Sequence, residues 1–220
     1  MLSKLLEKLR SSNVTNKYNF LIVAISGKAG AGKDTFGNSL IKSLDSCCIK
    51  TTQYAFADHL KESASFVFGV PVKSFYDRDK KEAKIDSLGI SPRKLMTSFS
   101  DLVQKIDPLI FTNKIEREIS ALVPSSSSSW NHVIVITDVR LPHEFEMLKR
   151  YNAVFVKVER PDVSTVESVA HLTETYIDSV PESEWFFKVH NTGTISDLSL
   201  SADLLSNTIS EAFMQNKASR

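Results

Sequence analysis

The chain has 220 residues, of which 42% are hydrophobic and 24% are charged, so it is long enough and apolar enough for one globular domain with a full core. The formal net charge is +1, which gives no whole-chain basic field of the kind that attracts nucleic acid. No apolar run approaches the length of a membrane span, and the two cysteines are adjacent, which suits a reducing cytosol better than a disulfide scaffold.

Residues 1–18 are expected to form an N-terminal amphipathic helix followed by a polar linker. Charged residues interrupt its apolar pattern, so the segment is not a signal peptide. We expect the helix to pack on the domain or on a second subunit, with a membrane-surface role as the alternative. The leucines that recur at helical spacing are Leu2, Leu5, Leu6 and Leu9.

A glycine-rich turn follows the first predicted strand, a continuous apolar run at residues 19–26 that we expect to be buried on both faces. From Gly27 to Lys33 the turn fits the phosphate-binding pattern of Gly, four residues, Gly and Lys. Backbone N–H groups of such a turn bind an anion together with the N-terminus of the following helix. Lys33, expected to be exposed at the sheet edge, would supply positive charge to the β- and γ-phosphates of a nucleotide. An ordinary glycine turn is the alternative. The expected nucleotide-binding residues are Gly27, Ala29, Gly30, Ala31, Gly32, Lys33, Asp34 and Thr35.

Asp34 departs from the general phosphate-loop pattern. A Ser or Thr that binds Mg²⁺ normally follows the lysine, whereas here Asp34 stands at that position and Thr35 comes next. A carboxylate is also a good ligand for a hard cation, either directly or through water. We therefore expect an altered metal coordination rather than its loss.

The rest of the chain alternates apolar strands with helical patterns. This alternation predicts an α/β fold with a parallel five-stranded sheet and helices on both faces. Right-handed crossovers then bring the carboxyl ends of the strands to one edge, where ligands bind in such sheets. The remaining strands are expected at about 49–56, 133–136, 154–158 and 185–189.

Two polar residues mark helix starts before the third strand. Asp58 follows the second strand and is placed to cap the helix after it. Ser91-Pro92 opens another helix, whose apolar stripe from Leu95 to Ile106 we expect to be buried. Arg93 lies in the first turn of that helix, where a cation is unfavourable unless an anion is nearby.

Polar side chains also follow the later strands. Asp138 and Arg140 come directly after the third strand, and Arg160 follows the fourth. In phosphoryl transfer an Asp at such a strand end holds Mg²⁺, and arginines stabilise the charge of the moving group. We therefore expect metal ligation by Asp138 and phosphate binding by Arg93, Arg140 and Arg160. The alternatives are a helix N-cap for Asp138 and surface ion pairs for the arginines.

The run from Ile25 to Thr35 resembles the glycine loop of the deoxynucleoside monophosphate kinases of tailed-phage type, in which Gly-Lys-Asp-Thr is usual. Shorter matches follow in the order of that family, and the resemblance covers about residues 20–205. The matching segments are Ala57-Asp58-His59-Leu60-Lys61, Lys81-Glu82, Ser91-Pro92-Arg93, Asp138-Val139-Arg140-Leu141-Pro142-His143-Glu144, His171-Leu172-Thr173-Glu174 and Asn191-Thr192-Gly193-Thr194-Ile195. In the helix after Arg93, Ser100 and Gln104-Lys105 stand where relatives usually carry Gly and Arg.

The resemblance implies a P-loop nucleoside monophosphate kinase-like domain at 19–216, with an acceptor-binding region at about 57–122 and a lid at about 160–184. It implies that Arg93 holds the acceptor's phosphate, that Arg140 reaches toward the transferring phosphate, and that Asn191 and Gly193 lie beside adenine. Arg160 would belong to the lid. The residues expected to bind the acceptor or the transferring phosphate are Asp58, Lys61, Lys81, Arg93, Asp138 and Arg140, and the metal ligands are Asp34 and Asp138.

We therefore expect a cytoplasmic enzyme, in the host cytoplasm if the chain is viral. It would transfer the γ-phosphoryl group of ATP–Mg²⁺ to a deoxynucleoside 5′-monophosphate, giving the diphosphate and ADP. No nucleic acid or membrane partner is expected, and a homodimer is left open. One alternative is another small-molecule kinase of the same fold, similar to phosphomevalonate or dephospho-coenzyme A kinase. A regulatory P-loop ATPase is the alternative from a different class.

Overall fold

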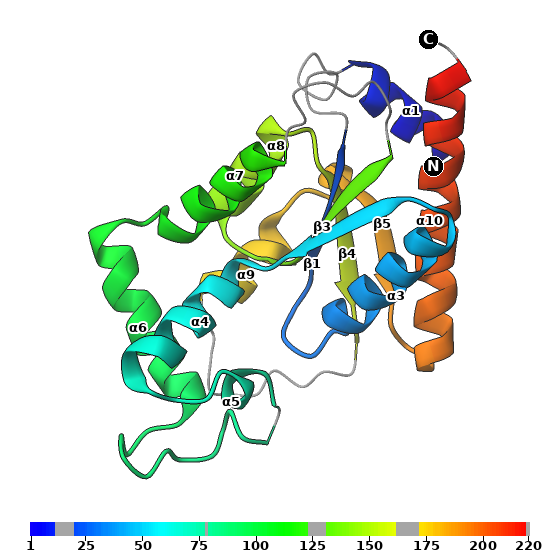
Figure 1. The fold of residues 1–220 in the computed structure, drawn as a ribbon. Coiled ribbons are helices and arrows are strands. Elements are labelled where there is room, and N and C mark those ends of the chain that lie inside the picture. The colour runs from blue at the N-terminus through cyan, green and yellow to red at the C-terminus, as the bar shows by residue number, and fades with distance from the viewer. Residues whose placement is uncertain (12–19, 78, 123–130, 162–171, 219–220) are drawn as a thin grey trace. The chain divides into compact units, whose positions relative to one another are not determined.

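The computed structural model describes residues 1–11, 20–77, 79–122, 131–161 and 172–218 (Figure 1). The chain divides into two compact units, each treated by itself below. The sheet unit comprises residues 1–54 and 120–220, and the helical unit comprises residues 55–119. The helical unit begins and ends close to the region 57–122 that the sequence suggests for acceptor binding.

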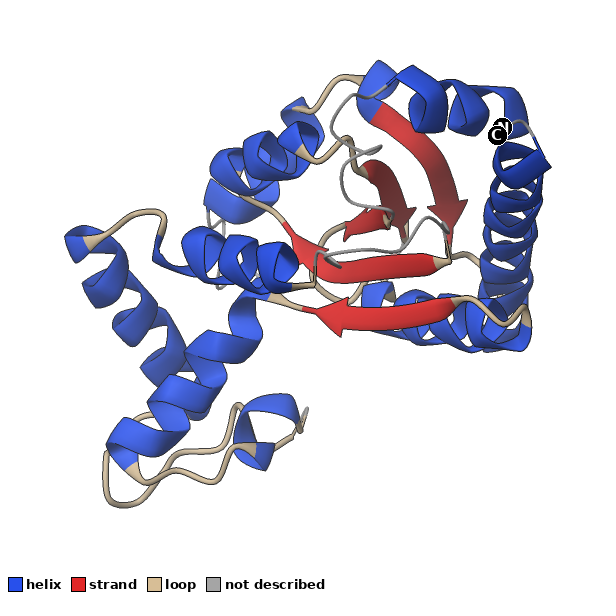
Figure 2. Ribbon diagram, turned by 45° about the horizontal axis from the view of Figure 1, so that its top comes forward, coloured by secondary structure: helices blue, strands red, loops and turns tan. Residues whose placement is uncertain are grey.

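The described part of the sheet unit contains a five-stranded sheet in the order β2-β3-β1-β4-β5, and every neighbouring pair is parallel. Figure 2 shows its strands in red among the blue helices. The predicted parallel five-stranded sheet is therefore confirmed. Its carboxyl-terminal edge carries the glycine loop after β1, as expected for this topology. The strands are β1 (Leu21–Ser26), β2 (Lys50–Tyr54), β3 (His132–Val139), β4 (Val154–Glu159) and β5 (Trp185–His190).

Helices cover both faces of this sheet. On one face, α1 (Leu2–Ser11), α3 (Lys33–Ser46) and α10 (Ile195–Ala218) share one apolar core with the strands. On the other face lie α8 (Pro142–Arg150) and α9 (Leu172–Ser179). There, the Phe145 ring stacks on Phe155 with centroids 5.0 Å apart and meets Tyr176 and Trp185 edge-on.

The N-terminal helix packs on the sheet unit, which is one of the two arrangements expected from the sequence. Leu5 and Leu9 are fully buried in the core that includes α3 and α10. The Lys8 ammonium donates to the carbonyl of Ala153, at 2.8 Å, directly before β4. α1 therefore lies at the amino-terminal edge of the sheet, opposite the glycine loop. None of the described helices is long and apolar enough to cross a membrane.

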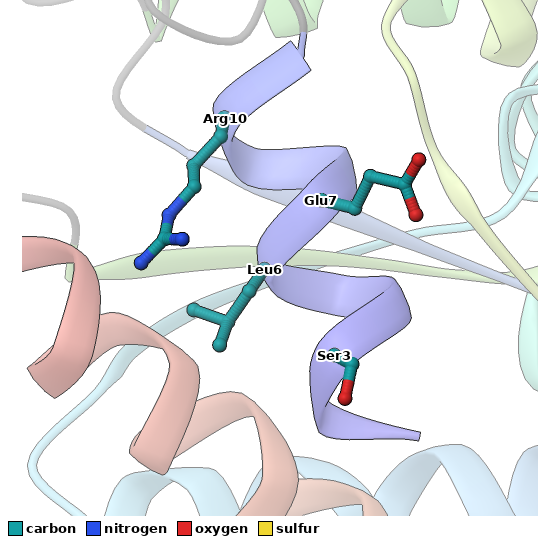
Figure 3. A pocket seen from close by; sticks show the side chains of 4 residues that line it. All are labelled: Ser3, Leu6, Glu7 and Arg10. Carbon is teal, nitrogen blue, oxygen red and sulfur yellow. The ribbon is translucent and has the colours of Figure 1, made fainter.

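A cavity of about 470 Å³ opens beside α1 (Figure 3). Because α1 lies at the amino-terminal edge, this cavity is not part of the site that the glycine loop predicts. The described residues that line it are Ser3, Leu6, Glu7 and Arg10.

The helical unit contains α4 (Phe56–Phe68), α5 (Lys73–Tyr76), α6 (Pro92–Ile106) and most of α7 (Ile110–Ala121). Gly69, with φ of 65°, ends α4 in the left-handed conformation that glycine allows. The Ser91 hydroxyl accepts a hydrogen bond from the backbone N–H of Lys94, and Pro92 occupies the first helical position of α6. This helix start agrees with the sequence prediction.

Two sequence predictions about the helical unit are wrong. Asp58 does not cap α4, because the N-cap is Ala55 and the Asp58 carboxylate binds side chains instead. The apolar stripe of α6 is buried at Leu95, but Leu102 and Ile106 are 58% and 81% exposed. Helical spacing shows which side of a helix is apolar, but it does not show whether the fold covers that side.

Candidate active site

The glycine loop runs from Gly27 to Gly32, between β1 and α3, and its backbone requires glycine at both ends. Gly27 has φ of 152°, and a Cβ atom there would lie 2.3 Å from the carbonyl oxygen of Val158. Gly32 has φ of 99°, and a Cβ atom there would lie 2.6 Å from Nδ2 of Asn191. Both conformations are strained for other residues, so the loop can pack closely on the ends of β4 and β5 only with glycine.

Lys33 is folded over the loop rather than exposed, which corrects the sequence expectation. Lys33 is only 6% exposed. Its Nζ donates hydrogen bonds to the carbonyl oxygens of Gly27, at 2.7 Å, and Lys28, at 2.8 Å. A buried ammonium needs such partners because burial without them is costly. An anion held by the loop would offer Lys33 charged oxygens, which form stronger hydrogen bonds than carbonyls do.

Asp138 and Arg140 lie beside the start of the glycine loop. Residue Val139, between them, is paired in register with Ser26, the last residue of β1. The strand end is held by Glu144, whose Oε2 accepts hydrogen bonds from the backbone N–H groups of Arg140, at 2.7 Å, and Leu141, at 2.9 Å. Glu144 thus closes the N-terminus of α8, so the alternative interpretation of Asp138 as the N-cap is wrong.

Glu144 has an unusual ionisation. Burial raises the pKa of the Glu144 carboxyl to about 8, and the negative charge of Asp138 contributes to this rise. The hydrogen bonds from Leu141 and Arg140 act in the opposite direction and lower the pKa. The carboxyl is therefore protonated near neutral pH. Sequence reasoning gave Glu144 no role, because the capping-box signal has Ser or Thr at the N-cap position, where this chain has Leu141.

Asn191 ties the end of β5 to the glycine loop. Its backbone N–H donates to the carbonyl of Glu159, at 2.7 Å, and its side-chain Nδ2 donates to the carbonyl of Ala31, at 2.9 Å. Gly193 follows in the turn before α10. The Asp197 carboxylate closes that turn by accepting hydrogen bonds from the backbone and hydroxyl of Thr194.

The expected lid is described only in part, because residues 162–171 lie outside the described residues. Arg160, directly after β4, is exposed. The later part is packed rather than loose, since Ile177 in α9 and Val180 after it are buried. Asp178 forms an ion pair with Lys28 of the glycine loop, with 2.8 Å between Oδ2 and Nζ. The short 3₁₀ helix Glu182–Glu184 then leads into β5.

In the helical unit, Asp58 and Lys61 form a cluster with a third residue that sequence reasoning missed. Oδ1 of Asp58 accepts hydrogen bonds from Nζ of Lys61, at 2.8 Å, and from the hydroxyl of Tyr76, at 2.7 Å. The same Nζ lies 4.0 Å from the centre of the Tyr76 ring. Tyr76 comes 18 positions after Asp58, so no local sequence signal predicts this contact.

Arg93 and Lys81 also lie together in the helical unit. The Arg93 backbone N–H donates to the carbonyl of Lys81, at 3.0 Å, and Arg93 Nε lies 2.5 Å from Oε1 of Glu82. Glu82 is therefore the anion that makes a cation tolerable in the first turn of α6. In the same helix, the Gln104 amide donates to the Ser100 hydroxyl, and Lys105 is exposed.

The donor set at the sheet edge fits a Mg²⁺ ion. No group of three or more metal-ligating side chains occurs in the described part of the chain. Mg²⁺ beside phosphates needs only one or two carboxylates, because phosphate and water oxygens complete its coordination. Asp34 is exposed in the first turn of α3, and Asp138 carries the negative charge that acts on Glu144. Both are hard oxygen donors that flank the glycine loop.

Comparison with known proteins identifies the family. Residues 73–201, more than half of the chain, match the family model described as deoxynucleotide monophosphate kinase. The chain belongs to this family. The resemblance drawn from the glycine loop and the Asp-Val-Arg segment is thereby confirmed, although the glycine loop itself precedes the matched residues. The α/β fold with a P-loop kinase-like parallel sheet agrees with this family.

A relative and two solved structures are also similar to the chain. "Putative deoxynucleotide monophosphate kinase" of Acanthamoeba polyphaga mimivirus is 24% identical over 168 residues, which cover 73% of this chain and 83% of that protein. Dephospho-CoA kinase from Campylobacter jejuni is 12% identical, with a TM-score of 0.49 over 88% of this chain and 99% of that chain. Shikimate kinase from Aquifex aeolicus is 16% identical, with a TM-score of 0.36 over 85% and 96% of the two chains. Both structures are too distant to bear on the activity of this chain.

Proposed function

We propose that the chain transfers the γ-phosphoryl group of ATP to a deoxynucleoside 5′-monophosphate, giving the diphosphate and ADP. The observation that carries the proposal is the glycine loop with Lys33 folded onto it, beside Asp138 and Arg140 at one sheet edge. Membership of the deoxynucleotide monophosphate kinase family supports the proposed substrate class. The loop's N–H groups would hold the phosphates, and Lys33 would exchange its two carbonyl partners for phosphate oxygens.

In the reaction, an oxygen of the acceptor phosphate forms a bond to the γ-phosphorus while the bond to the β,γ-bridging oxygen breaks. The acceptor is already an anion, so no general base is required. Lys33 and Arg140 would stabilise charge on the equatorial oxygens, and Arg160 would join them from the lid. Mg²⁺ held by Asp34 and Asp138, with phosphate oxygens, would neutralise the charge of the polyphosphate. Asn191 and Gly193 would border adenine.

The acceptor would bind in the helical unit. Arg93 would bind its phosphate: because Nε is bonded to Glu82, the terminal guanidinium nitrogens would be the ones to bind phosphate oxygens. Asp58, Lys61 and Lys81 would border the same nucleotide. The region at about 57–122 would therefore be the acceptor-binding part of the enzyme.

The experiment is an ADP-release assay with ATP, Mg²⁺ and a panel of deoxynucleoside and ribonucleoside monophosphates. We expect turnover that depends on a deoxynucleotide acceptor. Turnover without any acceptor would instead indicate a regulatory ATPase, and turnover only with dephospho-coenzyme A or phosphomevalonate would indicate another kinase of the same fold. The Lys33→Ala variant controls for contaminating kinases in each reaction.

A further inference from the structure

Tyr76, at the end of α5, is an exposed aromatic residue that is held in a fixed position. The residue is 53% exposed. Its hydroxyl donates to Oδ1 of Asp58, at 2.7 Å, and the Lys61 ammonium lies 4.0 Å from the ring centre. Asp58 and Lys61 are themselves paired, at 2.8 Å. Two residues of α4 therefore fix both the tip and the plane of a ring from a different helix.

The hydrogen bond from the exposed Tyr76 hydroxyl adds little to stability, because water competes for it and holding the ring in place costs entropy. The Asp58–Lys61 pair itself is less exposed, with 38% and 16% of the two side chains accessible. An aromatic ring that is ordered before binding is useful for recognition, because binding then costs less conformational entropy. Because 53% of Tyr76 is exposed, part of the residue is accessible for stacking by another flat ring.

We propose that Tyr76 is the stacking surface for the base of the acceptor nucleotide. This inference rests on the proposed function and on the placement of Asp58 and Lys61 at the border of the acceptor. Tyr76 lies within residues 73–201, the part of the chain that matches the kinase family. Base stacking on an aromatic ring tolerates every base, since each base has a π-face. Tyr76 therefore contributes affinity without selecting among bases.

The test separates the base from the rest of the acceptor. Binding of a series of deoxynucleoside monophosphates to the wild type and to Tyr76→Leu is measured by calorimetry, together with deoxyribose 5-phosphate, which lacks a base. We expect Tyr76→Leu to weaken every nucleotide by roughly tenfold to a hundredfold. Deoxyribose 5-phosphate should bind equally well to both proteins, and the KM for ATP should not change.

Two further variants make the result specific. Tyr76→Phe keeps the ring and loses only the bond to Asp58, so it should bind nucleotides within a few-fold of the wild type. Phe66→Leu is the matched control, because Phe66 is an aromatic residue of the same unit that is 90% exposed. It should leave all affinities unchanged. Urea unfolding of each variant verifies that it is folded.

Each outcome decides the inference. Equal nucleotide binding by the wild type and Tyr76→Leu would overturn it and leave the proposed function intact. An equal loss for deoxyribose 5-phosphate and the nucleotides would also overturn it, because Tyr76 would then act on the sugar or phosphate through Lys61. Loss of binding in Tyr76→Phe as severe as in Tyr76→Leu would do the same. If the wild type binds none of the nucleotides, the proposed function fails, and this inference fails with it.

Discussion

Substitution of Glu144 by Gln should make the stability of the protein less dependent on pH. The pKa of the Glu144 carboxyl is raised to about 8 by burial and by Asp138. Its ordinary value is 4.5. At a pH between these two pKa values, the Glu144 carboxyl has lost its proton in the unfolded chain but keeps it in the folded chain. The free energy of unfolding should therefore fall by about 1.4 kcal/mol for each pH unit, and by roughly 4–5 kcal/mol in full.

The Gln side chain does not titrate, and its carbonyl oxygen can still accept the hydrogen bonds from Arg140 and Leu141. Urea unfolding of both proteins, at intervals from about pH 5 to pH 8, gives the difference in stability directly. We expect Glu144→Gln to gain on the wild type as pH rises. Glu146→Gln, on the exposed side of the same helix, is the matched control and should follow the wild-type profile. A constant difference between Glu144→Gln and the wild type, or one that shrinks as pH rises, would refute the assignment of a protonated Glu144.

The remaining predictions concern the glycine loop and the acceptor site. Lys33→Ala should lower kcat/KM by about 10²–10³, because a charge contact in the transition state is lost. The control Lys42→Ala, on the same helix, should leave kcat/KM unchanged. More than a tenth of wild-type turnover in Lys33→Ala would contradict the role of Lys33. Gly32→Ala should abolish tight ATP binding, since its Cβ would lie 2.6 Å from the Asn191 side chain. Gly69→Ala, also at positive φ but with no atom within 4 Å of the new Cβ, should cost stability only. Arg93→Ala should raise the KM for the acceptor and leave the KM for ATP near normal. Titration of each substrate tests this, and an equal rise in both KM values would contradict the role of Arg93.

The sheet and the glycine loop could be predicted because their signals are local. Each buried parallel strand is a continuous apolar run, and the spacing from Gly27 to Lys33 fixes the turn between strand and helix. The burial of Lys33 could not be predicted, since the pattern shows that a lysine is present and not what it contacts in the absence of a phosphate.

Side-chain contacts between helices could not be predicted from the sequence either. Asp58 stands near a helix start, where an N-cap is the usual expectation, but its carboxylate binds Lys61 and Tyr76 instead. This choice depends on the packing of α5 against its neighbours, which no local pattern records. Glu82 was likewise part of a family match, yet only the structure shows that it pairs with Arg93.

In the proposed reaction, a deoxynucleoside monophosphate receives the γ-phosphoryl group of ATP. The most direct measurement is phosphorus NMR of a reaction that contains the protein, ATP, Mg²⁺ and one deoxynucleoside monophosphate at a time. We expect that, for at least one base, the deoxynucleoside diphosphate and ADP appear in equal amounts and no inorganic phosphate accumulates. Release of inorganic phosphate with no deoxynucleoside diphosphate, for every base tested, would contradict the proposed reaction.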